Sequence, residues 1–181
     1  MVGLRKIKYK KVKNFLTEDE VKLLKGYCTI RSRLRNNNFQ EEKRHENCFY
    51  GDPIMESLMV SKGPKVEKLT GLKLLPTYSY WRMYIYGSEL KPHKDRPSCE
   101  VSVTVCIDKD KKDWPIYMDD SEINLNPGDA VIYLGREVKH WRNELKGDFQ
   151  SQVFLHYVDQ NGEFTEHYKD KRTILGMRKG N

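Results

Sequence analysis

Residues 77–95 read TYSYWRMYIYGSELKPHKD, and this stretch decides the fold class. Its first part is rich in aromatic and β-branched residues and ends at Gly87, as expected for a strand that leads into a turn. Four similar runs follow, bounded by Gly, Pro, Asn or Asp: EVSVTVCID (100–108), WPIYMD (114–119), INLNPGDAVIYLG (123–135) and SQVFLHYVD (151–159). Short strands at this spacing predict a β-sandwich or jelly roll.

A helix is predicted near the N-terminus, where the alternating pattern of residues 7–13 changes its period. Thr17 is an N-cap candidate, and Glu20 follows it at the spacing of a capping box. The pattern predicts a helix from about Glu18 to Gly26. The next segment, residues 31–52, is polar and has no sustained periodicity, so we expect a long surface loop there.

A second helix is predicted to begin after Asp52, which precedes a proline, and to end at Gly71. The patterns together predict an α+β, mainly β protein with a jelly-roll core and N-terminal helices packed on one sheet. We expect a single domain in three parts: a helical part of about residues 1–73, a β core of about 74–160 and a basic tail, 161–181.

The composition narrows the class of protein. Lys and Arg number 33 and Asp and Glu 26, which gives a net charge of +7, and 38% of the residues are hydrophobic. The chain is too aromatic for a disordered protein and too charged for a membrane protein. Its four cysteines form no Cys-x-x-Cys pair, and its basic residues are spread along the chain, which does not favour nucleic acid as a partner. We expect a cytoplasmic protein with reduced thiols.

Three residues form a candidate metal site. His93 and Asp95 follow a turn, and side chains at i and i+2 of an extended backbone point to the same side. His140 follows a second turn and strand. Two histidines and one carboxylate on a β scaffold match the facial triad of non-haem Fe(II) oxygenases, which leaves coordination positions open. Zinc accepts the same ligand types, so these residues alone leave the metal undecided.

Over most of its length the sequence resembles the Fe(II)- and 2-oxoglutarate-dependent oxygenases, in particular their prolyl 4-hydroxylase-like branch. Three stretches carry the resemblance: NFLTEDEVKLL (14–24), YIYGSELKPHKD (84–95), which is similar to Y-x-x-G-x-x-L-x-x-H-x-D, and LNPGDAVIYLG (125–135), which leads to the distal histidine. The resemblance implies a double-stranded β-helix fold. It also implies that His93, Asp95 and His140 bind Fe(II) and are the catalytic centre.

The implied activity is that of an oxidoreductase, a dioxygenase that hydroxylates an unactivated C–H bond. It would consume 2-oxoglutarate and O2 and release succinate and CO2. A prolyl residue of a peptide or protein is the first substrate expected. The same chemistry on a small molecule or a nucleobase is an alternative, the nucleobase being supported only by the positive charge. An alternative from another class is a non-catalytic jelly-roll binding module that has lost turnover.

The resemblance further implies how 2-oxoglutarate is held. Tyr86 matches the family tyrosine that offers its hydroxyl to this co-substrate. Family members place an Arg or Lys about ten residues past the distal histidine, where it holds the far carboxylate. Here that position is Gln150, and residues 150–159 contain no Arg or Lys. Unless another basic residue serves, this departure favours the binding module.

Strand alternation offers two substitutes. Arg82 shares strand parity with Tyr86, so it would face the same pocket, where a carboxylate would partner its guanidinium. A structural ion pair is the other interpretation of Arg82. Arg142, just past the distal histidine, is the second choice. Gln152 on the last strand would face inward and hydrogen-bond either the co-substrate or a metal ligand. His156 is interpreted as a core histidine in preference to a fourth ligand or a catalytic base.

Overall fold

Two antiparallel sheets form the centre of the computed structural model, which describes residues 3–34, 40–43 and 46–177. The larger sheet has the order β1-β9-β6-β11-β4-β3-β2, and the smaller one β5-β10-β7-β8. The strands of the larger sheet are β1 (Tyr9–Val12), β2 (Gln40–Lys43), β3 (Glu46–Tyr50), β4 (Leu74–Ile85), β6 (Val101–Lys109), β9 (Ala130–Leu134) and β11 (Phe149–Asp159). Those of the smaller sheet are β5 (Leu90–His93), β7 (Ile116–Met118), β8 (Ser121–Ile123) and β10 (His140–Arg142).

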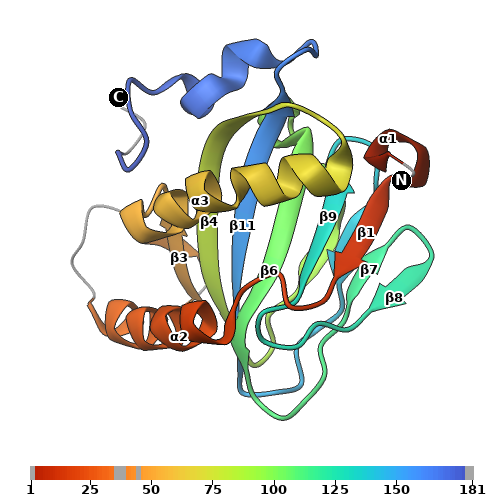
Figure 1. Ribbon diagram of the computed structural model, residues 1–181. Coiled ribbons are helices and arrows are strands. Elements are labelled where there is room, and N and C mark those ends of the chain that lie inside the picture. The colour runs from red at the N-terminus through yellow and green to blue at the C-terminus, as the bar shows by residue number, and fades with distance from the viewer. Residues whose placement is uncertain (1–2, 35–39, 44–45, 178–181) are drawn as a thin grey trace.

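Helices cover one face of the larger sheet. The α-helices are α1 (Leu4–Ile7), α2 (Glu18–Arg33) and α3 (Pro53–Thr70), and α2 and α3 lie across the strands in Figure 1. Two short 3-10 segments are described as well, η1 (Pro97–Cys99) and η2 (Thr165–Lys171), and η2 is interrupted by a kink with non-helical backbone at Tyr168, Lys169 and Asp170. This arrangement confirms the predicted mainly β jelly roll with N-terminal helices on one sheet. No helix in the described part of the chain is long and apolar enough to cross a membrane.

Strand alternation divides the side chains of the larger sheet between two environments. One face contributes apolar residues to the core beneath the helices, including Val101, Val103, Val105, Val153 and Leu155. The residues between them on β6 and β11 face the smaller sheet, and several of these are buried and polar: Ser102, Thr104, Gln150, Gln152 and His156. Buried polar groups need partners, so this inner face is where a ligand is expected.

Helix α2 is longer than the sequence pattern predicts. Its start is as expected, because Thr17 Oγ1 accepts a hydrogen bond from Glu20 N and Glu20 Oε2 accepts one from Thr17 N. The helix then continues through Gly26 to Arg33. Cys28, on this second half, is buried against the larger sheet. Tertiary packing of this half therefore outweighs the helix-breaking tendency of the glycine.

Residues 31–52 do not form one long surface loop. The described parts of this segment include β2 and β3, which pair as a hairpin and extend the larger sheet beside β4. Phe49 is fully buried, and its ring stacks on Trp81 with ring centroids 4.3 Å apart. Arg31 Nε lies 3.2 Å from the buried carboxylate of Asp52, which also caps α3. Residues 35–39 and 44–45 lie outside the described part.

The C-terminal segment that contains Asp170 and Arg172 is bonded to the loop that follows β5 through the contact of Asp170 with Arg96. Asp170 is buried, and its Oδ2 accepts hydrogen bonds from Tyr50 at 2.6 Å and from Arg96 at 3.2 Å. Arg172 forms an ion pair with Glu56 at 2.5 Å, and both side chains are almost wholly buried. The segment therefore supports the loop that contains Arg96, one residue after the candidate metal ligand Asp95.

Replacing Gly26 by alanine tests the length of α2. A Cβ at this position meets no atom within 4 Å, so Gly26→Ala should raise the free energy of unfolding by about 0.5–1 kcal/mol, as expected inside a helix. Gly71 ends α3 with φ of 76°, and Gly71→Ala should lower that energy. Urea unfolding measures both. A helix that ended at Gly26 would make the first variant lose stability too.

Candidate metal centre

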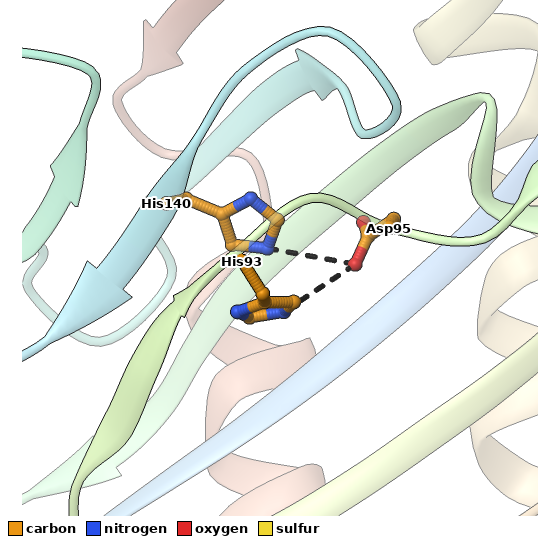
Figure 2. Close-up of side chains that lie close together, drawn as sticks. All are labelled: His93, Asp95 and His140. Carbon is orange, nitrogen blue, oxygen red and sulfur yellow. Dashed lines mark ion pairs between the residues drawn. The ribbon is translucent and has the colours of Figure 1, made fainter.

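The three predicted ligands converge between the two sheets. His93 ends β5 and His140 begins β10, and the antiparallel register pairs them directly, with ring centroids 4.2 Å apart. Asp95 lies two residues after β5, and its Oδ1 is 3.6 Å from Nε2 of His93 and 3.5 Å from Nε2 of His140. Figure 2 shows the three side chains pointing toward one another. Their ligand atoms all lie within 4.8 Å of each other, as binding of one ion requires.

Hydrogen bonds orient both imidazole rings toward this point. Nδ1 of His93 donates to the carbonyl oxygen of Lys91 at 2.8 Å, and Nδ1 of His140 donates to that of Val138 at 3.1 Å. A neutral ring that donates from Nδ1 presents an unprotonated Nε2, which is the form that binds a metal. Tyr133 packs edge-on against His140 with ring centroids 4.8 Å apart and restricts its rotation.

The electrostatics suit a cation. Burial acts to raise the pKa of Asp95, but contacts with the His140 and His93 rings outweigh it and hold this pKa well below its ordinary value. The hydrogen bond to Asp95 raises the pKa of His93 in turn. The centre thus keeps an ionised carboxylate beside two imidazoles and attracts positive charge, whether a proton or a metal ion.

Gly135 permits the close approach of the Asp95 loop. The backbone N–H of Asp95 donates to the carbonyl oxygen of Gly135 at 2.8 Å. A Cβ on Gly135 would lie 2.5 Å from Asp95 Oδ2 and would collide with the carbonyl oxygen of Cys99. Only glycine therefore fits where the strand after the Pro-Gly-Asp turn passes the candidate ligand Asp95.

A cavity of about 250 Å³ opens beside the triad. It is lined, besides the three ligands, by Tyr78, Tyr80, Arg82, Tyr84, Leu90, Tyr133, Phe154 and His156. Arg82 thus lies in its wall, with Cζ 4.2 Å from the centroid of the Tyr84 ring. A half-buried guanidinium among aromatic rings provides both charge and packing at the edge of the cavity.

The structure does not bring Tyr86 into the cavity. Tyr86 follows the end of β4 and is 66% exposed. Tyr84, two residues earlier, is 1% exposed and lines the cavity. Tyr84 is also the tyrosine that stands three residues before Gly87, as the Y-x-x-G stretch requires. Tyr84, not Tyr86, is therefore the tyrosine that the fold places at the cavity beside the triad.

Arg142 lies on the inner side of β10 and is almost wholly buried. Its Nη1 donates to the carbonyl oxygen of Trp114 at 2.5 Å, and its guanidinium lies 4.7 Å over the Trp114 ring. Nε and Nη2 have no hydrogen-bond partner among the described residues. Burial lowers the pKa of Arg142 to about 10, so the side chain stays charged at neutral pH. A buried cation with two unused donors calls for an anion.

Two amides of β11 add to these unused donors. Nε2 of Gln150 and Nε2 of Gln152 are buried without a hydrogen-bond partner in the described part of the chain. Thr104 Oγ1 donates to Gln152 Oε1 at 3.2 Å, which fixes the orientation of that amide. Arg142 follows His140 by two residues, about 6.6 Å along an extended strand. Arg142, Gln150 and Gln152 are not among the residues that line the cavity, but Gln150 and Gln152 pair across the sheet with Tyr84 and Arg82, which do line it.

A second group of ligand types, Asp95, Cys99 and His156, also lies within 4.8 Å. It suits a metal less well. Burial raises the pKa of Cys99 to about 12, so the thiol stays protonated, and its sulfur lies 3.1 Å from the Tyr78 hydroxyl. Burial lowers the pKa of His156 to about 4, so this ring is neutral, and it is the protonated thiol that disfavours a metal here. Ser102 joins His156 to Asp95 by hydrogen bonds. The sequence does not show this contact, because strand alternation indicates only that Ser102 and His156 each face inward on their own strand.

Comparison with known proteins identifies the fold. No family model and no curated protein matches the sequence. Among solved structures, the non-haem alpha-ketoglutarate-dependent epimerase SnoN of nogalamycin biosynthesis has a TM-score of 0.71 at 14% identity, covering 86% of this chain and 80% of its own. A prolyl-4-hydroxylase of Pseudomonas putida has a TM-score of 0.62 at 19% identity, with 87% of this chain and 96% of its own covered.

A third similar structure is the viral collagen prolyl hydroxylase of Paramecium bursaria Chlorella virus-1 in complex with 2-oxoglutarate. Its TM-score is 0.63 at 11% identity, over 83% of this chain and 95% of its own. All three similarities extend over most of both chains. One of the three proteins is named as an alpha-ketoglutarate-dependent enzyme and the other two as prolyl hydroxylases. The chain therefore has the double-stranded β-helix fold of the Fe(II)- and 2-oxoglutarate-dependent oxygenases.

Proposed function

We propose that the protein is an Fe(II)- and 2-oxoglutarate-dependent dioxygenase that hydroxylates an unactivated C–H bond. The observation that carries the proposal is the triad of His93, Asp95 and His140, together with the buried nitrogens without partners on Arg142, two residues after His140, and on Gln150 and Gln152. When bound, iron and 2-oxoglutarate supply the oxidising chemistry, in which O2 is consumed and succinate and CO2 are released. The residues of the chain hold these groups, orient them and exclude water.

Each ligand has a definite part in this proposal. His93 and His140 present neutral nitrogens and Asp95 presents the single negative charge, so that three coordination positions stay open for the co-substrate and O2. A structural zinc site would be closed by a fourth protein ligand. The open set on a β scaffold therefore favours iron and turnover over a purely structural role.

Arg142 is proposed to hold the far carboxylate of 2-oxoglutarate, with Gln150 and Gln152 as additional donors. The unused nitrogens of these three residues support this choice, because a buried donor left without an acceptor costs about 1–3 kcal/mol. Gln150, whose identity favoured the binding-module alternative in the sequence, becomes part of the support for an enzyme. Arg82, which lines the cavity beside the triad, is the other candidate.

Aromatic residues keep this region dry. Tyr84, Trp114 and Phe154 form an apolar cluster with Leu145 beneath the cavity. The Tyr84 and Trp114 rings meet edge-on, with centroids 4.8 Å apart. In such low-dielectric surroundings a guanidinium–carboxylate contact is stronger than in water. The proposed co-substrate would thus be held in a site from which bulk water is excluded.

A prolyl residue of a peptide or protein is the proposed substrate. The motifs resemble the prolyl 4-hydroxylase-like branch, and two of the similar structures are prolyl hydroxylases. The tyrosines of the cavity wall, Tyr78 and Tyr80, suit the apolar faces of a pyrrolidine ring. A small molecule is the second candidate, because the structure of SnoN, an enzyme of nogalamycin biosynthesis, is at least as similar.

The cofactor pair can be tested without a substrate. Anaerobic addition of Fe(II) and then 2-oxoglutarate should produce the visible charge-transfer band of a chelated 2-oxo acid. His93→Ala removes one ligand and should abolish the band. His167→Ala is the control, since His167 lies outside the cavity beside Glu166, and it should keep the band. Metal binding without any band in the unchanged protein would contradict the co-substrate assignment.

The carboxylate anchor is tested by comparing Arg142→Met with Arg82→Met. Loss of a charge-assisted hydrogen bond costs about 1.5–3 kcal/mol, so Arg142→Met should weaken 2-oxoglutarate binding by about 10- to 100-fold. Arg82→Met should change it by less than about threefold, because Arg82 is only partly buried and water screens its contact with an anion. Titration of the charge-transfer band measures both affinities. The reverse order would assign the anchor to Arg82.

The substrate class is tested by succinate release. A proline-rich peptide should stimulate succinate formation above the level without peptide and should gain the mass of one oxygen atom. The same peptide with alanine in place of every proline should do neither, because it lacks the target ring. An active cofactor complex that gives equal succinate with both peptides would exclude prolyl hydroxylation and leave the small-molecule candidate.

A further inference from the structure

A serine hydroxyl joins the metal ligand Asp95 to His156. Ser102 Oγ donates to Asp95 Oδ2 at 3.1 Å and lies 2.9 Å from Nδ1 of His156. The register of β6 and β11 pairs Ser102 directly with His156, so the sheet itself sets this contact. Oδ2 is the carboxylate oxygen that the serine engages, whereas Oδ1 is the one that faces the two histidine ligands.

The acceptors around Ser102 show which atom donates in each hydrogen bond between His156, Ser102 and Asp95. A hydroxyl has one proton, and three atoms could accept that of Ser102: Asp95 Oδ2 and the carbonyl oxygen of Cys99, both at 3.1 Å, and Nδ1 of His156 at 2.9 Å. The charged carboxylate is the strongest acceptor. Because the Ser102 proton goes to Asp95, the Ser102 oxygen accepts, and Nδ1 of His156 must be the donor. The chain runs from His156 through Ser102 to Asp95.

The side chains of Ser102 and His156 have little freedom to rotate away from these hydrogen bonds. Ser102 is fully buried on the inner face of β6. The His156 ring lies 4.5 Å from the ring of Tyr78 and is almost parallel to that of Phe154, with centroids 6.4 Å apart. The same ring lines the cavity beside the triad. A chain held in this way fixes the atom at its end.

We propose that Ser102 and His156 are positioning residues that hold Asp95 so that Oδ1 faces the metal. The inference rests on the proposed metal centre. An aspartate carboxylate has a broad χ2 preference and, without a partner on Oδ2, would rotate between one- and two-oxygen binding. Hydrogen-bond partners of ligating carboxylates typically change metal affinity by about 10- to 100-fold when removed.

The metal alone is a sufficient probe. Titration with Co(II), followed by its visible absorption, measures affinity without co-substrate or turnover. Ser102→Ala should weaken Co(II) binding by about 10- to 100-fold, and Ser102→Thr, which keeps the hydroxyl, should bind within about threefold of the unchanged protein. Thr104→Ala removes a hydroxyl two residues along the same strand that contacts Gln152 and not Asp95, so it should leave Co(II) affinity unchanged.

Two replacements of His156 separate hydrogen bonding from packing. His156→Asn keeps an N–H donor close to the position of Nδ1 but loses the ring, whereas His156→Phe keeps a flat ring and loses the donor. We expect the asparagine variant to bind Co(II) nearly as the unchanged protein does, and the phenylalanine variant at least about tenfold more weakly. The opposite order would show that His156 acts only by packing and would overturn the proposal.

Failure of this inference is distinguishable from failure of the metal centre. If the unchanged protein does not bind Co(II), or binds it independently of His93, the proposed centre itself is wrong. If binding depends on His93 and Ser102→Ala binds equally well, only the positioning role is wrong. Long-range proton–nitrogen NMR of the unchanged protein needs no variant: it should find the His156 proton on Nδ1, and a proton on Nε2 alone would refute the assignment.

Discussion

The antiparallel pairing of β5 with β10 is the interaction on which the candidate site depends. It sets His93 opposite His140, and the loop after β5 then brings Asp95 within reach of both rings. Metal ligands on paired strands are held by the backbone ladder, so their spacing does not depend on long flexible side chains. The rest of the fold supports this pairing, because the larger sheet closes the space on the side opposite these strands.

The second constraint is the polar inner face of the larger sheet. Apolar burial stabilises the core, yet Gln150 and Gln152 on this face, and Arg142 on β10 of the smaller sheet, have buried donors without partners among the described residues. Such groups reduce stability by an amount that matters against a typical total of about 5–15 kcal/mol. Local departures from good packing of this kind concentrate at functional sites. The same alternation that gives Val103 and Leu155 to the core gives Ser102 and His156 to the site.

The triad could be predicted because its information is local. His93 and Asp95 share one extended stretch, and the Pro-Gly-Asp turn marks the strand before His140. The sequence also contained the signal for Tyr84 in place of Tyr86, since Tyr84 is the tyrosine that stands three residues before Gly87; strand parity alone did not show that β4 ends one residue before Tyr86. The hairpin of β2 and β3 was missed because its buried apolar residues, Cys48 and Phe49, make too short a pattern for a strand prediction.

The three candidate ligands differ in solvent exposure, so the centre has a buried side and an open side. The His93 side chain is 38% exposed, that of Asp95 13% and that of His140 3%. In the proposed function, the buried side beyond His140, where Arg142 lies, receives the co-substrate, and the open side near His93 receives the substrate. The Asp95 loop between them is held by Gly135 and by the contact of Arg96 with Asp170.

The contact of Arg96 with Asp170 requires strained backbone in the C-terminal segment. Lys169, Asp170 and Lys171 all have positive φ, which costs a non-glycine residue roughly 1 kcal/mol each. The cost is offset locally, because Asp170 is buried on Tyr50 and Arg96 and the neighbouring Arg172 is buried on Glu56. The contacts of Asp170 and Arg172 therefore stabilise a strained C-terminal segment, and through Arg96 that segment fixes the loop containing the candidate ligand Asp95.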